Sequence, residues 1–139
     1  MTPESPSQLH LRRAAIVDDS GEFQVLAQMM LDYIGVSEIR CYSFASEALP
    51  ALLESPPDLL LLDQMMAGID GITLLKQLRG HAATARLPVI ICTAAINRFL
   101  DQEEQLRTDP YTAVLAKPFS IEELQAVLTR LIPLMNTTS

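Results

Sequence analysis

Four short stretches of the chain are almost entirely apolar and do not alternate with polar residues. They cover residues 14–17, 59–62, 89–92 and 113–116. Continuous apolar runs of this length are typical of parallel strands that helices cover on both faces of a sheet. Leu-rich and Ala-rich runs also occur in helices, but turn-forming prolines stand before three of the four runs. These prolines are Pro56, Pro57, Pro88 and Pro110. A fifth stretch, residues 37–42, alternates apolar and charged positions and predicts an edge strand with one solvated face.

The segments between these runs have the spacing of amphipathic helices, with apolar residues three or four positions apart. Predicted helices cover residues 22–34, 48–53, 72–78, 96–106 and 121–131. Pro50 leaves the beginning of the second helix undefined, and Pro133 is expected to follow the end of the last one. The predicted caps are Asp19 with Glu22, Asp70, and Ser120 with Glu123 at helix beginnings, and Gly35 and Gly80 at helix ends.

Strand and helix patterns alternate five times along the chain. This alternation predicts an α/β fold, a doubly wound five-stranded parallel sheet with helices on both faces. The edge pattern of residues 37–42 favours the strand order 2-1-3-4-5, the flavodoxin-like three-layer sandwich. We expect residues 1–11 to form a mobile N-terminal tail, residues 12–132 one domain, and residues 133–139 a short C-terminal tail.

Composition narrows the possible functions. The 139 residues carry a net charge of −7, which argues against a nucleic-acid-binding surface, because contacts to phosphate need clustered Lys and Arg. Half of the residues are hydrophobic, yet no apolar stretch has the length of a membrane span, so we expect a cytoplasmic protein. Cys41 and Cys92 lie in separate apolar stretches and are expected to be buried, reduced thiols and not zinc ligands.

Polar residues whose side chains can bind a metal or take part in catalysis stand where four of the predicted strands end. They are Asp18 with Asp19, Asp63, Thr93 and Lys117. The carboxyl ends of parallel strands meet in one crevice, so we expect these side chains to converge there. Each has an ordinary alternative role, since acids often cap helices, threonines occupy turns and lysines are solvated. Their shared placement favours a functional site, and carboxylate oxygens are the ligands that Mg²⁺ prefers.

Such a set of residues suits phosphoryl transfer. A carboxylate such as that of Asp63 can attack phosphorus and form an aspartyl phosphate. The developing charge then lies on the phosphoryl oxygens, where the ammonium of Lys117 and the hydroxyl of Thr93 can neutralise it or donate to it.

These residues stand in four sequence stretches that occur together in one known family. The stretches are residues 16–20 (IVDDS), 62–71 (LDQMMAGIDG), 92–94 (CTA) and 117–119 (KPF). From about residue 14 to residue 132, the chain resembles the receiver domain of bacterial two-component response regulators. The resemblance implies that Asp63 is the phosphoacceptor and that Asp18, Asp19, Asp63 and the backbone carbonyl of Met65 hold Mg²⁺. It also implies that Thr93 and Lys117 contact the phosphoryl group, and that Pro118 follows a cis peptide bond.

The chain departs from this family at several positions. Ala67 stands where the family usually has proline, and Val114 stands where it often has Tyr or Phe. Near Val127, an arginine that is typical of receivers dimerising through the fourth and fifth helices is absent. In the family, the side chains that correspond to Met65 and Ala95 influence the attack of water on the phosphoryl group, and neither can orient a water molecule by hydrogen bonding.

The resemblance implies a phosphoryl-accepting receiver. A histidine kinase or phosphotransfer protein would phosphorylate it, and the phosphorylated receiver would switch a downstream protein target. We expect no direct nucleic-acid or membrane partner, and no enzyme activity beyond the chain's own phosphorylation and dephosphorylation. A stand-alone regulator and a receiver cut from a longer chain both stay open.

Three alternatives remain at this point. A phosphatase of the haloacid-dehalogenase type would need a second aspartate where Met65 stands. A flavin or nucleotide binder would need a phosphate-binding loop where Asp18 and Asp19 would repel phosphate. A scaffold that works without phosphorylation is the third, because Val114 could belong to a degraded switch.

Overall fold

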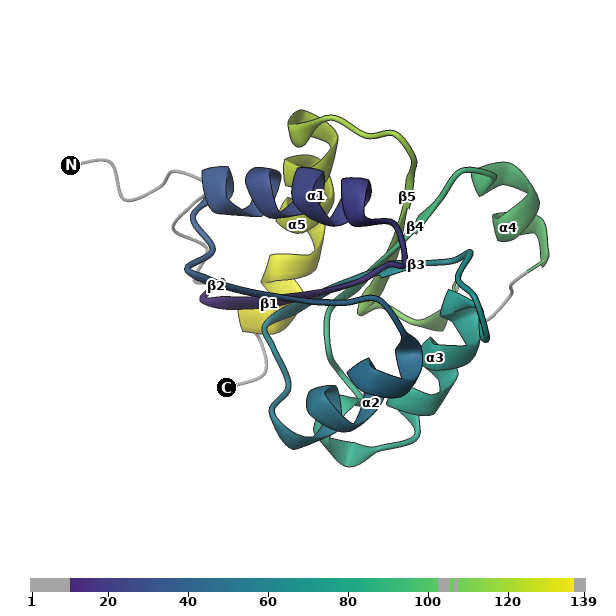
Figure 1. Cartoon of the computed structure of the whole chain (residues 1–139). Coiled ribbons are helices and arrows are strands. Elements are labelled where there is room, and N and C mark those ends of the chain that lie inside the picture. Colours follow the sequence, from purple (N-terminus) through teal and green to yellow (C-terminus); the bar gives the residue numbers. More distant parts are fainter. Residues whose placement is uncertain (1–10, 103–105, 107, 137–139) are drawn as a thin grey trace.

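A computed structural model of the chain describes residues 11–102, 106 and 108–136. Five strands form one sheet in the order β2-β1-β3-β4-β5, and every neighbouring pair is parallel (Figure 1). The strands are β1 (Arg13–Val17), β2 (Glu38–Tyr42), β3 (Leu59–Asp63), β4 (Val89–Thr93) and β5 (Thr112–Ala116). The predicted parallel sheet, its order and the edge position of the second strand are confirmed.

Helices cover both faces of the sheet (Figure 1). They are α1 (Gly21–Ile34), α2 (Ala45–Glu54), α3 (Gly71–Arg79), α4 (Ile96–Gln102) and α5 (Ile121–Asn136), with a short 3₁₀ turn at Ala82–Thr84. Buried residues of α1 and α5 pack on one face, and buried residues of α2, α3 and α4 pack on the other. The molecule is therefore the expected three-layer sandwich.

The continuous apolar runs of the central strands are explained by these two cores. In β3, the side chains of Leu59 and Leu61 point to the α1–α5 core, and those of Leu60 and Leu62 point to the α2–α3 core. All four are fully buried. Because both faces of β3 and β4 are covered by helices, alternation with polar residues is lost in both strands.

Most predicted helix caps are confirmed, and one is wrong. Asp70 accepts a hydrogen bond from Thr73 N, and Ser120 and Glu123 form the reciprocal capping box. The N-cap of α1 is Ser20, whose hydroxyl accepts from Phe23 N, and not Asp19. Asp19 is instead turned toward the loop after β3, where it accepts a hydrogen bond from Ala67 N.

Two helices extend beyond the predicted limits, and each contains a proline. The second helix begins at Ala45 and runs through Pro50, and the last continues through Pro133 to Asn136. Each proline lacks the N–H that would donate to the carbonyl four residues earlier, which belongs to Ser46 in α2 and to Thr129 in α5, and both of these residues are exposed. The sequence left the beginning of the second helix undefined because of Pro50, and the structure places it at Ala45. The prediction that the last helix ends before Pro133 was wrong.

The remaining boundaries differ slightly from expectation. The described part of α4 is Ile96–Gln102, and the predicted continuation of this helix to residue 106 falls on residues 103–105, which are not described. Leu11 is buried in the α1–α5 core, although it was assigned to the tail; the rest of that predicted tail, residues 1–10, is not described. At the other end, residues 133–136 continue α5, and residues 137–139 are not described.

The two cysteines have different surroundings. Cys92 is buried and Cys41 only half-buried, and both are free thiols. Burial raises the pKa of Cys92 to about 12, so this thiol is an inert core group. No helix in the described part of the chain combines the length and the apolar character that crossing a membrane requires.

Candidate functional site

Three carboxylates meet at the carboxyl edge of the sheet, where β1 and β3 end side by side. Oxygen atoms of Asp18, Asp19 and Asp63, one from each carboxylate, lie within 4.8 Å of one another. The Asp18 and Asp63 side chains are almost fully buried, whereas Asp19 is exposed. The sequence prediction that these acids converge is confirmed.

Lys117 reaches the same point from the end of β5, two strands away from β3. Its ammonium donates to Asp18 Oδ2 at 2.8 Å and to Asp63 Oδ1 at 3.1 Å. The Lys117 backbone N donates to Thr93 O at 2.8 Å, which ties the lysine to the end of β4. The Lys117–Pro118 peptide bond is cis, as the family resemblance implies.

The charges in this cluster do not balance. Among the described residues, Lys117 is the only cation that hydrogen-bonds any of the three acids, and it bonds Asp18 and Asp63 but not Asp19. Burial raises the pKa of Asp63, the charge of Asp18 raises it further, and the hydrogen bond and charge of Lys117 offset these effects only in part. Burial lowers the pKa of Lys117, but its hydrogen bonds to Asp18 and Asp63, together with the charges of these two acids, outweigh burial and raise the pKa overall. The site therefore carries excess negative charge in a poorly solvated place.

Backbone N–H groups and one amide side chain hold the two adjacent acids in place. Asp18 Oδ1 accepts from Ser20 N at 2.8 Å, and Asp19 Oδ2 accepts from Ala67 N at 3.1 Å. Gln24 Nε2 donates to the backbone carbonyl of Asp18 at 2.6 Å and to Ser43 Oγ at 3.2 Å. Gln24 thus ties the end of β1 to the loop after β2, a role that the sequence did not indicate.

The loop after β3 brings the beginning of α3 directly against the backbone of Asp63. A Cβ atom at Gly71 would lie 2.5 Å from the Asp63 carbonyl oxygen, so only glycine fits there. Gly71 N donates to Gln64 O, and Ile72 N donates to Gln64 Oε1, both at 2.9 Å. In the sequence, Gly71 stands out only as the last residue of the family stretch 62–71. The structure explains why this position is a glycine.

Thr93 and Met65 lie beside the acids. The Thr93 side chain is buried, and its hydroxyl accepts from Ala95 N at 3.1 Å. Since Asp63 is in register with Cys92, Thr93 stands one residue further along the neighbouring strand. The backbone of Met65 hydrogen-bonds the Asp63 carboxylate, while the Met65 side chain is exposed. A role for the Met65 carbonyl as a metal ligand stays a prediction.

An aromatic ring completes the surroundings of the lysine. The Lys117 ammonium lies 4.1 Å from the centre of the Phe23 ring, and Phe23 contacts Phe119 edge to face at 5.7 Å between ring centres. The sequence analysis assigned Phe23 only to the apolar face of a helix. Its spacing from Lys117, which is distant in the chain, carries no signal that could have shown this contact.

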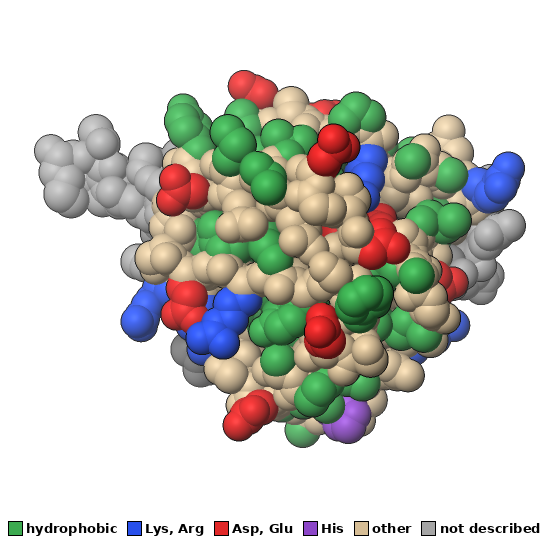
Figure 2. Space-filling view, viewed as in Figure 1, with side chains coloured by type: hydrophobic (Ala, Val, Ile, Leu, Met, Phe, Trp, Pro, Cys, Tyr) green, Lys and Arg blue, Asp and Glu red, His purple; other side chains and the backbone are tan. Residues whose placement is uncertain are grey.

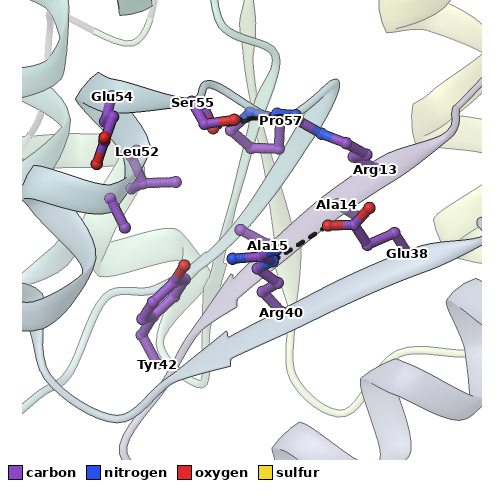
Figure 3. A pocket seen from close by; sticks show the side chains of 11 residues that line it. Arg13, Ala14, Ala15, Glu38, Arg40, Tyr42, Leu52, Glu54, Ser55 and Pro57 are labelled. Atoms are coloured by element: carbon purple, nitrogen blue, oxygen red, sulfur yellow. Dashed lines mark hydrogen bonds and ion pairs between the residues drawn. The ribbon is translucent and has the colours of Figure 1, made fainter.

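A separate hollow lies beside the edge strand β2 and below the end of α2 (Figure 3). Its volume is about 140 Å³, and its charged side chains are Arg13, Arg40, Glu38 and Glu54. Arg13 is engaged with Ser55 and the Pro56 carbonyl, and Arg40 is paired with Glu38. Because its cations and acids are equal in number, this hollow lacks the excess charge of the carboxylate cluster.

Comparisons with known proteins agree with this geometry. The model of the response regulator receiver domain matches residues 14–129. The phosphate regulon transcriptional regulatory protein PhoB of Rhizobium meliloti is 36% identical over 121 residues, which cover 84% of this chain and 50% of that protein. The chain spans about half the length of the curated relatives PhoB and BaeR.

Solved structures show the same fold. A putative response regulator from Chloroflexus aurantiacus is 30% identical with a TM-score of 0.72, covering 88% of this chain and 98% of that one. The receiver domain of the sensor histidine kinase PA1611 from Pseudomonas aeruginosa, described with a magnesium ion in its active-site cleft, has a TM-score of 0.77 at 24% identity, covering 88% of this chain and 98% of that one. The sequence match over residues 14–129, together with this fold, establishes that the chain belongs to the receiver domain family of two-component response regulators.

Proposed function

We propose that the chain accepts a phosphoryl group on Asp63 from a histidine kinase or phosphotransfer protein, with Mg²⁺ bound beside it. The observation that carries this proposal is the buried Asp63 carboxylate, which touches Lys117 and lies within reach of two further acids. A scaffold that works without phosphorylation would have no need for this costly cluster of like charges.

The carboxylate cluster suits a magnesium ion. Asp18, Asp19 and Asp63 supply hard oxygen ligands that lie close together, and their excess charge matches a divalent cation. The Met65 carbonyl would be a further ligand, as the family resemblance implies. Bound Mg²⁺ would supply charge neutralisation at the oxygens of the transferred phosphoryl group.

The chain's own residues would carry the transfer. An Asp63 oxygen forms the new bond to phosphorus while the bond between phosphorus and the donor's histidine nitrogen breaks. Lys117, already 3.1 Å from Asp63, would follow the charge onto the phosphoryl oxygens, and Thr93 would donate its hydroxyl to one of them. The chain would act only on its own phosphorylation and dephosphorylation, and we place this exchange in the cytoplasm.

The surface next to the cluster offers a place for the donor protein. Exposed apolar side chains gather over α1, which begins directly after Asp18 and Asp19 (Figure 2). They are Val25, Leu26, Met29 and Tyr33. An apolar helix face beside a phosphoacceptor suits a protein donor better than a small phosphodonor alone.

A downstream target would read a change around Thr93. The Thr93 hydroxyl now accepts from Ala95 N, directly before α4, so turning it toward a phosphoryl group alters this bond. Val114 packs with the α2–α3 core and is too short and stiff to swing as an aromatic side chain would. We therefore propose that the loop before α4 and α4 itself carry the change, and that the partner contacts the face formed by α4, β5 and α5. Amide exchange should change most within residues 93–106, and less at Val114, when beryllofluoride is added.

Intact-protein mass spectrometry tests the acceptor directly. With Mg²⁺ and acetyl phosphate, the wild type should gain one phosphoryl group, and Asp63→Asn should gain none. Asp32→Asn, which removes an exposed acid of α1, is the matched control and should be labelled like the wild type. A wild type that is never labelled, or an Asp63→Asn variant that is labelled equally, would overturn the proposal.

A further inference from the structure

We propose that Phe23 is a positioning residue for phosphoryl acceptance, whose ring holds the Lys117 ammonium beside Asp63. This inference rests on the proposed function, because it assigns Phe23 a part in the same reaction. Phe23 comes from the first turn of α1 and Lys117 from the end of β5, so the contact joins two sides of the site.

The surroundings of the ammonium leave one side for the ring. A lysine ammonium has three N–H donors. In this site, Asp18 Oδ2 and Asp63 Oδ1 accept from it at 2.8 and 3.1 Å, and the centre of the Phe23 ring lies 4.1 Å away. The face of an aromatic ring attracts a cation, and this attraction is stronger where water is excluded.

A ring holds the cation in a different way from a carboxylate. The ring has no lone pair that accepts a strong hydrogen bond. The ammonium therefore has no such bond to break on the side of the ring when it turns toward a phosphoryl oxygen. The ring also covers the ammonium with apolar surface, which keeps water from competing for the remaining N–H donor. Phe23 thus restrains the position of Lys117 while leaving its donors to the acids and to the incoming group.

Two contacts restrain the Phe23 ring, one through its backbone and one through Phe119. The Phe23 backbone N donates to the Ser20 hydroxyl, so the residue belongs to the capped first turn that directly follows Asp18 and Asp19. The ring meets Phe119 edge to face, and the Phe119 side chain is buried two residues after Lys117. An edge-to-face pair restrains both rings, so the Phe23 face is held toward the ammonium.

Substituting leucine and tyrosine for Phe23 separates the ring face from simple packing. Phe23→Leu keeps an apolar side chain but removes the face, and Phe23→Tyr keeps the face. In NMR spectra of the Mg²⁺-free protein, the Lys117 Cε methylene should be ring-current shifted in the wild type and in Phe23→Tyr, and the shift should be lost in Phe23→Leu. Labelling by acetyl phosphate at saturating Mg²⁺ should be about three- to tenfold slower in Phe23→Leu, and close to the wild-type rate in Phe23→Tyr.

The outcomes distinguish a failure of the Phe23 role from a failure of Asp63 as the phosphoryl acceptor. Equal labelling rates for Phe23→Leu and wild type, or unchanged Lys117 resonances, would overturn the role of Phe23 while leaving Asp63 as the acceptor. A wild type that shows the ring-current shift but is never labelled would overturn the proposed function and, with it, this role. If Phe23→Leu does not fold, Phe23→Met serves as the second aliphatic variant, with the same expected loss of shift and rate.

Discussion

Two clusters of charged side chains lie at opposite edges of the sheet, and they are built differently. At the amino edge, Arg79 at the end of α3 pairs with Asp109, and at the carboxyl edge Lys117 faces three acids. The Arg79 and Asp109 side chains are largely removed from water, as are those of Lys117, Asp18 and Asp63, whereas Asp19 is exposed. They differ in balance, because one cation meets one acid in the first, and one cation meets three acids in the second.

The Arg79 cluster satisfies its own hydrogen bonds. Arg79 donates to Asp109 Oδ2 at 2.9 Å, to the Thr84 carbonyl at 2.9 Å and to Thr112 Oγ1 at 2.8 Å. The second oxygen of Asp109 accepts from Tyr111 N at 3.0 Å. This cluster needs nothing from outside and ties α3 to the beginning of β5. The Asp63 cluster contains more acids than cations, and under the proposed function a divalent cation would neutralise this excess.

Breaking the balanced cluster should have the largest effect on stability. Arg79→Met leaves Asp109 charged and poorly solvated, so we expect the free energy of unfolding to fall by about 3 kcal/mol. Phosphoryl labelling of the folded protein should persist. Urea denaturation followed by circular dichroism measures the loss.

Arg40→Met is the matched control, because its pair with Glu38 is exposed on β2. It should cost less than about 1 kcal/mol. If both substitutions lower the free energy of unfolding equally, the Arg79 cluster stabilises the fold no more than a surface ion pair does. The role of the Arg79 cluster as a structural tie would then be contradicted.

Supplying the missing charge should stabilise the unbalanced cluster. Mg²⁺ at about one hundred times its dissociation constant should raise the free energy of unfolding by about 2.7 kcal/mol, because it binds the folded acidic site. Asp19→Asn should remove most of this gain, and Glu38→Gln, which removes one exposed acid elsewhere, should keep it. Thermal denaturation with and without Mg²⁺ gives the comparison, and a gain that survives in Asp19→Asn would place the metal elsewhere.

Acidity should test the same imbalance without metal. The pKa of Asp63 is raised above its ordinary value of 3.8, chiefly by burial and then by the charge of Asp18. Between the ordinary and the raised value, the folded protein binds more protons than the unfolded chain, so its stability falls as pH rises through this window. Lys117 stays charged throughout this range, because its pKa is raised and not lowered.

We therefore expect metal-free Asp63→Asn to be more stable than the wild type at pH 7, by an amount that shrinks toward pH 4. Urea denaturation at several pH values measures the difference between the two proteins. A difference that stays constant or grows as pH falls would show that the Asp63 carboxylate is not destabilised in the folded protein.

The sequence predicted the unbalanced cluster much better than the balanced one. Asp18, Asp63 and Lys117 each directly follow or end an apolar strand, and parallel strands bring such positions together by topology alone. Arg79 and Asp109 lie at a helix end and in a loop, where no periodic pattern places them in space. The same limit explains why Phe23 and Gln24 were missed, because their partners depend on packing between distant elements.

Helix limits were misjudged for a different reason. Proline was interpreted by its local effect, yet α2 and α5 tolerate Pro50 and Pro133 because apolar residues on their inner faces pack on the sheet. The cap of α1 was misassigned because Asp19 was expected to pair with Glu22 in the first turn of the helix. In the structure, the Asp19 carboxylate instead accepts a hydrogen bond from Ala67 N in the loop after β3.

The smallest expected effect concerns the open side of the unbalanced cluster. Met65 follows Asp63 by two residues, and its side chain is exposed. The family resemblance implies that the side chain at this position influences the attack of water on an aspartyl phosphate. A thioether is a weak acceptor and cannot donate a hydrogen bond, so it does not orient an attacking water molecule. Met65→Asn should therefore lose the phosphoryl group a few-fold faster than the wild type, whereas Met65→Leu should decay at the wild-type rate. Phosphoryl loss after removal of acetyl phosphate, followed by intact mass, measures both rates. Equal decay in Met65→Asn and Met65→Leu would mean that access and not orientation limits water attack, and the unbalanced cluster would then protect its phosphoryl group through burial alone.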